Sequence, residues 1–335
     1  MPSALIVGAG VTGACLALAL SRRGVRVTVI DQAAAASGAS GASFGWINAS
    51  YALNPAHFAL RSEGIAAHHR LARDLGADLW DWPGCLWFDD PEAKAAELSA
   101  QGYEVQPLTA SQVQAREPRL SQPALFLPQE GAVDVAGLAR AALVASGAEV
   151  ILGLPVTRAS AGRVQTPAGD FTADHVILAN GCGAQVLCGL PMLRRPGLML
   201  VSKPLPRVLS HILALPGQDL RQDRQGRLLA PLAPHHQSDS AETVADIPAQ
   251  VAAGKARLSA LLGVEVRAES VTLAYRPVPG DQLPAIGALA PGLWAAVMHS
   301  GATLAPVVAE GLAALITGGA APLLSPFSPA RLLAG

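Results

Sequence analysis

The chain has 335 residues, of which 51% are hydrophobic, and this is enough for one large domain or two modest domains with a substantial core. Charged residues make up only 15% and the formal net charge is -1, which excludes the basic surface of a protein that binds nucleic acid or an acidic membrane. The expected ligand is therefore a small molecule.

The apolar segments near the two ends are not predicted to be signal peptides or membrane spans. Glycines interrupt the N-terminal stretch and no basic segment precedes it, so we interpret it as part of the fold. Residues 301–324 carry Pro306 and Glu310, which favours a buried helix over a membrane span. The cysteines lack CxxC or metal-ligand spacing, which predicts reduced thiols in a cytoplasmic chain: Cys15, Cys85, Cys182 and Cys188.

The first 31 residues carry the most specific local pattern. An apolar run leads into Gly8, Gly10 and Gly13, and a helical stretch and a second apolar run then end at Asp31. This spacing predicts a strand, a glycine turn, a helix and a strand, with the helix N-terminus facing a pyrophosphate and Asp31 accepting hydrogen bonds from a ribose diol. We interpret the segment as a dinucleotide site, the alternative being a structural βαβ unit without a ligand.

A run of small residues follows at 33–43 and leads into Phe44, Trp46 and Ile47. Residues this small let the backbone run against a bulky ligand. The alternative is a flexible linker, but a linker would not normally lead into large apolar side chains, so we favour a ligand-lining role.

The middle of the chain alternates between helical and extended patterns. Residues 58–79 have helical apolar spacing, and we interpret His57, His68 and His69 as ordinary surface or interface histidines. A Pro-Gly break then marks the first predicted domain boundary. The elements expected next are a strand at 86–88, a helix at 90–98, an irregular proline-rich segment at 107–128, a helix with Asp134 as its N-cap, a strand at 149–152, a hairpin at 163–172 and a buried parallel strand at 174–179.

Residues 193–278 predict a separate antiparallel sheet with a helix on it. The strand candidates are 197–202, 227–230 and 270–276, and the helix candidate is 249–262. His235 and His236 lie in a polar stretch without a third ligand at a recognisable spacing, so we interpret them as solvated and assign no metal.

The last segment predicts a strand at 293–298, a glycine turn and a helix in which Pro306 is early enough to be tolerated. A second helix N-terminus therefore points at the same sheet, where it can hold negative charge.

Six stretches, taken in this order, resemble the D-amino acid oxidase family of FAD-dependent oxidoreductases, which includes glycine oxidase, sarcosine oxidase and D-amino acid dehydrogenases. They are GAGVTG, SGASGASFGW, GAVDVAGLARAAL, VILANGCG, RPVPGDQLPAIG and MHSGATLAPVVAE. The resemblance implies an α/β fold with a Rossmann-like FAD-binding domain of the GR2 type and a smaller antiparallel α+β substrate domain. The expected division is 1–80, 130–192 and 279–335 for the FAD-binding domain, and 81–129 and 193–278 for the substrate domain.

The resemblance also implies which residues hold FAD. The glycine turn would lie at the pyrophosphate, Asp31 at the ribose, residues 40–45 along the phosphates, ribityl chain and flavin, and residues 301–304 at the pyrimidine edge. The residues assigned in this way are Gly8, Gly10, Val11, Thr12, Gly13, Asp31, Gln32, Ser40, Gly41, Ala42, Ser43, Gly45, Val156, Ala179, Gly181, Gly301, Ala302, Thr303 and Leu304.

Arg276 matches the family arginine that grips a substrate carboxylate, and the alternative is a structural arginine paired with Asp281. Trp46, Asn48 and His299 are further pocket candidates, although Trp46 could be core and His299 could act only through its backbone. The sequence departs from the family in two ways. The turn at 299–301 offers no second arginine, and the middle sheet offers no convincing partner tyrosine, so the substrate stays open.

The predicted activity is oxidation of a small amino acid or secondary amine by hydride transfer from the α C–H to flavin N5, with oxygen or a carrier as electron acceptor. Two alternatives remain. The first is an FAD-dependent dehydrogenase of a 2-hydroxy acid or another small molecule, and the second is a catalytically weak FAD-binding partner protein.

Overall fold

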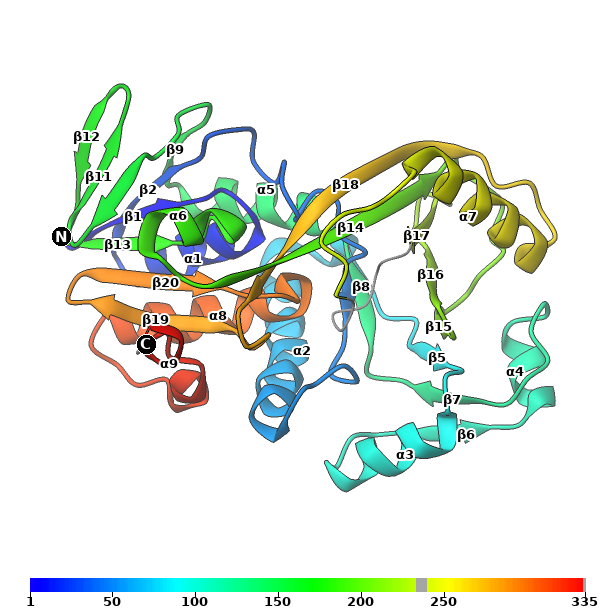
Figure 1. The fold of residues 1–335 in the computed structure, drawn as a ribbon. Coiled ribbons are helices and arrows are strands. Elements are labelled where there is room, and N and C mark those ends of the chain that lie inside the picture. The colour runs from blue at the N-terminus through cyan, green and yellow to red at the C-terminus, as the bar shows by residue number, and fades with distance from the viewer. Residues whose placement is uncertain (233–239, 334–335) are drawn as a thin grey trace.

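The structure, a computed structural model, describes residues 1–232 and 240–333 and is built around two large sheets (Figure 1). The first has six strands in the order β19-β20-β13-β1-β2-β9. Pairing is parallel from β20 to β9, and β19 joins the edge in the antiparallel direction. The bounds are β1 (Ser3–Val7), β2 (Arg26–Ile30), β9 (Glu149–Ile151), β13 (His175–Leu178), β19 (Ala285–Ala290) and β20 (Leu293–Val297). The predicted Rossmann-like sheet is confirmed.

Both faces of this sheet are covered. Ala4 and Ile6 of β1 belong to a core shared with helices on one face, while Leu5 and Val7 belong to a second core under a three-stranded meander. Burial on both faces explains why the strand is a continuous apolar run. The helices are α1 (Val11–Ser21), α2 (Pro55–Leu75), α5 (Val135–Ser146) and α8 (Gly301–Ile316), and the meander is β10 (Arg158–Ser160), β11 (Arg163–Thr166) and β12 (Gly169–Thr172).

The second sheet has eight strands in the order β18-β14-β17-β16-β15-β5-β7-β6. Two long strands, β14 (Met192–Ser202) and β18 (Ala268–Pro279), run from the first sheet into the second (Figure 1). Helix α7 (Ile247–Leu262) packs on one face through Leu258 and Leu262. The remaining strands are β5 (Cys85–Trp87), β6 (Gln106–Leu108), β7 (Ala124–Leu127), β15 (Ile212–Leu215), β16 (Gln218–Gln222) and β17 (Leu228–Leu232).

The remaining elements are short. Three of them form a small sheet in the order β3-β8-β4. The bounds are β3 (Trp46–Ile47), β4 (Trp80–Asp81), β8 (Gly131–Val133), α3 (Pro91–Ala100), α4 (Ala110–Arg116), α6 (Ala184–Cys188), α9 (Ala330–Leu333), η1 (Ala77–Leu79), η2 (Gly181–Gly183) and η3 (Pro322–Phe327).

Several sequence predictions are confirmed locally. Asp134 caps α5 by accepting the backbone N–H of Gly137 at 2.9 Å, and the predicted hairpin is β11 and β12. The prediction of an irregular segment at 107–128 is wrong, because it holds β6, β7 and the helix α4, whose capping box joins Thr109 and Gln112. Strands β15, β16 and β19 were not predicted.

Two histidine predictions are also wrong. His57 and His68 are only 2% and 0% exposed, because they lie on the inner face of α2, whereas His69 is exposed. His235 and His236 lie outside the described residues. Within residues 1–232 and 240–333, no group of His, Cys, Asp or Glu side chains is arranged to hold a metal ion, and none of the described helices has the length and apolar character to cross a bilayer.

Candidate functional site

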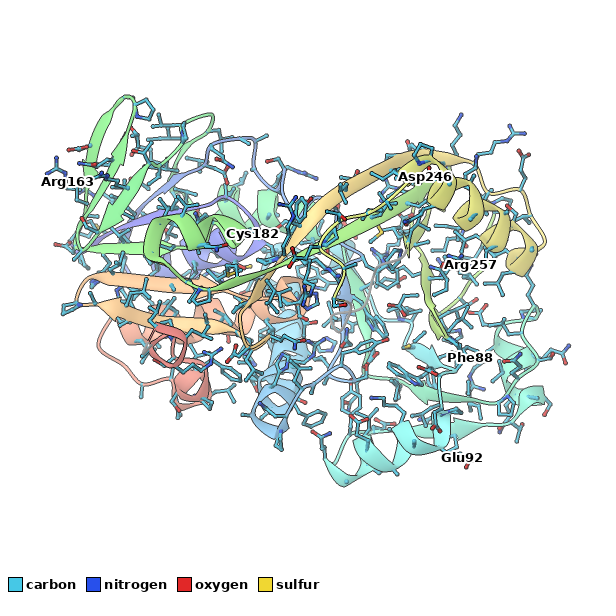
Figure 2. The ribbon with its side chains drawn as sticks, viewed as in Figure 1. Phe88, Glu92, Arg163, Cys182, Asp246 and Arg257 are labelled. Carbon is cyan, nitrogen blue, oxygen red and sulfur yellow. The ribbon has the colours of Figure 1, made fainter. Side chains whose placement is uncertain are left out.

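A cavity of about 390 Å³ lies where the first sheet meets the open face of the second. Its wall begins at the N-terminus of α1, follows residues 39–53, crosses β14 and β18, and returns to the N-terminus of α8. Cys182, labelled in Figure 2, lies after β13 at the point where β18 passes, and its Sγ is 3.6 Å from the carbonyl oxygens of Tyr275 and Arg276. The cavity is therefore built from segments far apart in the sequence.

The three glycines of the first turn have different structural roles. Gly8 has φ +112°, and a Cβ there would lie 2.6 Å from the carbonyl oxygen of Ala179. A Cβ at Gly13 would collide with the carbonyl oxygen of Gly8. Gly10 is the N-cap of α1, and a Cβ there would lie 3.1 Å from Ser40 Oγ. Gly8 and Gly13 are thus required by packing inside the fold, while Gly10 keeps the helix N-terminus open.

Asp31 and Ser40 hold the glycine turn in place. The Asp31 carboxylate accepts the backbone N–H of Ala9 at 2.7 Å and that of Ala33 at 2.9 Å. Ser40 Oγ accepts the N–H of Val11 at 3.0 Å. A carboxylate oxygen has a second lone pair, so Asp31 can still accept a hydrogen bond from a diol.

The N-terminus of α8 is fixed by contacts to α2 and β3. Thr303 Oγ1 donates to the carbonyl oxygen of Trp46 at 3.1 Å and accepts the N–H of Asn48 at 3.3 Å. His68 Nε2 donates to the carbonyl oxygen of Ala302 at 2.6 Å, and its Nδ1 accepts the indole N–H of Trp80 at 3.0 Å. These partners select the neutral Nε2–H tautomer, and burial lowers the pKa of His68 to about 4.

Arg61 is a buried cation in the cavity wall next to that helix end. Its Nε donates to the carbonyl oxygen of Asn48 at 3.0 Å, its Nη2 to the side-chain oxygen of Asn48, and its Nη1 to Ser300 Oγ at 2.8 Å. Burial lowers the pKa of Arg61 to about 10, so it stays protonated at neutral pH. The positive end of α8 and the guanidinium therefore act on the same part of the cavity.

Trp46 belongs to both the core and the cavity wall. Its indole N–H donates to Glu130 Oε2 at 2.9 Å, and its ring meets that of Tyr51 edge to face at 5.4 Å. Glu130 is fully buried and also accepts the backbone N–H of Ser50 at 3.3 Å. Burial raises the pKa of Glu130 to about 7.

Arg276 lines the cavity from inside β18, where it pairs with Arg195 of β14. Its Nη2 donates to the carbonyl oxygen of Pro196 at 3.1 Å. The alternative pairing with Asp281 is not what the structure has, because Asp281 forms its ion pair with Arg331 at 2.7 Å. The expectation that Arg276 ends a strand is also wrong, since β18 continues to Pro279.

His299 lies beside the same part of the cavity and is neutral. Its Nδ1 is 2.9 Å from Ser300 Oγ. Burial, with the nearby charges of Arg276 and Arg61, lowers the pKa of His299 to about 3.

The structure brings most of the predicted site residues to one cavity. Those in its wall are Val11, Thr12, Ser40, Ala42, Ser43, Gly45, Trp46, Asn48, Arg276, His299, Gly301 and Ala302. The others are not in this wall, and of these a group forms or supports the glycine turn beside it: Gly8, Gly10, Gly13, Asp31 and Ala179. Thr303 and Leu304 are fully buried behind the wall, Gln32 and Gly41 are exposed, Val156 packs beneath the meander, and Gly181 lies 3.6 Å from Pro277, measured from its ideal Cβ.

Four charged or aromatic residues of the wall were missed by sequence reasoning: Tyr51, Arg61, Lys94 and Asp219. Arg61 and Lys94 lie in helical patterns where a basic residue is usually a solvated one. Asp219 lies in an unpredicted strand. No local signal distinguishes any of them from an ordinary polar residue.

The cavity wall and the adjoining glycine turn, which Asp31 holds, carry groups that would suit FAD. Backbone N–H groups at the start of α1 suit a pyrophosphate, Asp31 suits a ribose diol, and the start of α8 suits the electron-rich edge of a flavin. Gly10 is a further relevant observation, because a Cβ there would lie 3.1 Å from Ser40 Oγ, beside the N-terminus of α1.

Comparison with known proteins identifies the family. Residues 3–315 match the family described as FAD dependent oxidoreductase (DAO). An uncharacterized oxidoreductase of Bacillus subtilis, YurR, is 28% identical over the whole of both chains. The glycine oxidase of Geobacillus kaustophilus is 29% identical over 67% of this chain and 68% of its own. Its crystal structure has a TM-score of 0.84 and 24% identity over 99% of each chain, and L-proline dehydrogenase from P. horikoshii has a TM-score of 0.85 and 19% identity over 100% and 98%.

Proposed function

The chain belongs to the FAD dependent oxidoreductase family, and from this premise we propose that it oxidises a small amine that also carries a carboxylate, such as an amino acid, to the corresponding imine. Bound FAD would supply the acceptor for the hydride of the α C–H bond. The named glycine oxidase and L-proline dehydrogenase relatives both act on amino acids according to their names, which supports this class of substrate.

The observation that carries the proposal is the position of Arg276. It lines the same cavity as the small-residue loop, which includes Ser40 and Ala42. A guanidinium binds a carboxylate through two parallel N–H donors, which fixes the orientation of the substrate as well as its position. Arg276 would therefore hold the carboxylate and present the adjacent carbon to the flavin.

Other residues near Arg276 determine the charge at this end of the cavity. Arg61 and the N-terminus of α8 stabilise negative charge at the edge of the cavity where Gly301 and Ala302 lie. His299 is neutral, so it adds no positive charge beside the reacting amine, which must be unprotonated so that its lone pair forms the C=N bond as the α C–H gives up a hydride. The imine formed by the oxidation would then hydrolyse in water without a side-chain base.

Arg276→Lys and Arg276→Ala test the proposal. Loss of the two-donor contact should lower kcat/KM for carboxylate-bearing amines progressively, by about 10- to 150-fold for a charge-assisted interaction of roughly 1.5 to 3 kcal/mol. Neutral amines should be affected little, and FAD content and Tm should stay near those of the unaltered protein. The measurement is steady-state turnover of D-amino acids, N-methyl amino acids and 2-hydroxy acids, with oxygen and with an artificial acceptor.

Arg194→Lys is the matched control, because Arg194 lies on β14 near Arg276 but is exposed and donates to the Tyr275 hydroxyl. Equal losses for neutral amines and carboxylates in the Arg276 variants would show a structural arginine. Turnover of 2-hydroxy acids alone would replace the amine by an alcohol as the reacting group.

A further inference from the structure

Asp219 points from β16 toward the cavity. Successive side chains of a strand face opposite sides of the sheet. Gln218 faces α7, where Arg257, labelled in Figure 2, donates to its Oε1 at 2.7 Å, and Leu220 belongs to the core under α7. Asp219 and Arg221 face the other way, and Arg221 Nε donates to the carbonyl oxygen of Phe44 in the cavity loop at 2.6 Å.

The carboxyl group of Asp219 is buried and incompletely bonded. The residue is only 8% exposed, and within residues 1–232 and 240–333 its buried Oδ1 has no hydrogen-bond partner. Buried polar atoms are nearly always paired, because an unpaired one keeps the full desolvation penalty. Glu130, the other buried acid near this end, has Trp46 and Ser50 as donors. Asp219 is therefore the acid that retains the capacity to bind a ligand.

Asp219 and Arg276 lie on one face of the same sheet, with two strands between them. Arg276 is on β18 and Asp219 is on β16, and β14 and β17 lie between these two strands. Met199 of β14 and Pro231 of β17 also line the cavity. A group that binds a carboxylate and a group that is itself a carboxylate thus occupy separate positions of one wall. A ligand that satisfies both must carry opposite charges at a distance from each other.

We propose that Asp219 binds a positively charged nitrogen of the substrate, distinct from the amine that is oxidised, so that the substrate is a basic amino acid and not a small neutral one. The inference rests on the proposed function for the carboxylate at Arg276 and deepens it by naming the substrate class. The cationic nitrogen would donate to the unpaired oxygen of Asp219.

The surroundings of Asp219 favour a cation. Trp87 on β5, Ala214 on β15 and Asp219 are cross-strand neighbours, and the rings of Trp87 and Tyr51 are 4.9 Å apart. The Trp87 face already receives the ammonium of Lys94, at 4.8 Å from the ring centroid, so a cation is held beside this aromatic pair. Burial raises the pKa of Asp219 to about 7, with Glu130 adding to the shift, and a bound cation would reverse this rise and restore the carboxylate.

The experiment compares ligands that differ only in the distal charge. The oxidisable pairs are ornithine with norvaline and lysine with norleucine, in both D and L forms, and the non-oxidisable pair is 5-aminopentanoate with pentanoate. Turnover is measured on the holoenzyme, and binding of the non-oxidisable pair is measured by inhibition and by the shift in Tm. We expect a preference of at least 10-fold for the charged member of each pair, which Asp219→Asn should abolish.

Two controls separate binding from structure. Glu265→Gln removes an exposed carboxylate, paired with Arg267 far from the cavity wall, and should leave the preference intact. Asp219→Asn should keep FAD content and a Tm at or above that of the unaltered protein, because it removes a buried acid without breaking a bond at Oδ1. A lower Tm or loss of FAD in this variant would overturn the inference in favour of a structural acid.

The outcomes also separate this inference from the proposed function. Turnover of neutral amino acids without preference for a distal charge would refute the role of Asp219 and leave the amine oxidation standing. Binding of 5-aminopentanoate that depends on Asp219, without turnover of any amine, would support the cation site and refute the proposed reaction.

Discussion

The two sides of the cavity differ in how a buried charged group is hydrogen-bonded. On the α2 side of the cavity, all three guanidinium nitrogens of Arg61 and both ring nitrogens of His68 are hydrogen-bonded to neighbours. On the second sheet, Asp219 keeps a buried oxygen without a partner among the described residues. If the α2 side holds FAD in every catalytic cycle and the β16 side receives the substrate, as we propose, closed hydrogen bonds suit the first side and an open group suits the second.

The largest effect is expected at Gly10, the N-cap of α1. In Gly10→Val, the added side chain would displace Ser40 Oγ, which lies 3.1 Å from the ideal Cβ, and would obstruct the pyrophosphate. The purified variant should be colourless and should not take up FAD, as judged by the ratio of visible to ultraviolet absorbance. Gly38→Ala is the control, because its Cβ would meet nothing within 4 Å. A yellow Gly10→Val protein would contradict the placement.

Arg61→Met tests the contrast between a buried group with all its hydrogen bonds formed and one with an unpaired oxygen. The change removes a buried cation and leaves Asn48 and Ser300 with unpaired oxygens, so we expect a loss of about 3–5 kcal/mol in the free energy of unfolding. Asp219→Asn, measured beside it by urea denaturation, should show no loss. Similar losses in the two variants would mean that the two sides do not differ in the way proposed.

A smaller effect is expected from the protonation of His68. Its pKa in the folded protein is about 4, below the ordinary value of about 6.5 in an unfolded chain. The unfolded state therefore binds the proton first, so the contribution of His68 to stability is complete above pH 6.5 and falls as the pH is lowered toward 4, by about 3 kcal/mol at most.

His68→Gln keeps a donor for the carbonyl oxygen of Ala302 but cannot be protonated in this range. Its free energy of unfolding should therefore fall less steeply than that of the unaltered protein between pH 6.5 and 4. His57 and His299 have pKa values of about 3 and contribute in the same direction in both proteins. Parallel pH profiles would refute the assignment of a neutral, buried His68.

Sequence alone was sufficient where the signal is local. The apolar run ending in Gly8, Gly10 and Gly13 forms β1, its turn and α1, because each element depends on residues a few positions apart. Asp134 caps α5 for the same reason. The proline-rich segment at 107–128 misled us, because the capping box of α4 lies among prolines that suggest irregular chain.

Only the tertiary structure decided which polar residues face the cavity. Arg61 and His68 lie on α2 among other charged residues, and their burial follows from the packing of α2 against α8. Asp219 faces the cavity because β16 is paired with β17 in one register, and a shift by one residue would turn it toward α7. Local sequence determines where strands and helices begin, but strand pairing and helix packing determine which side chains are enclosed, and these depend on residues far apart in the chain.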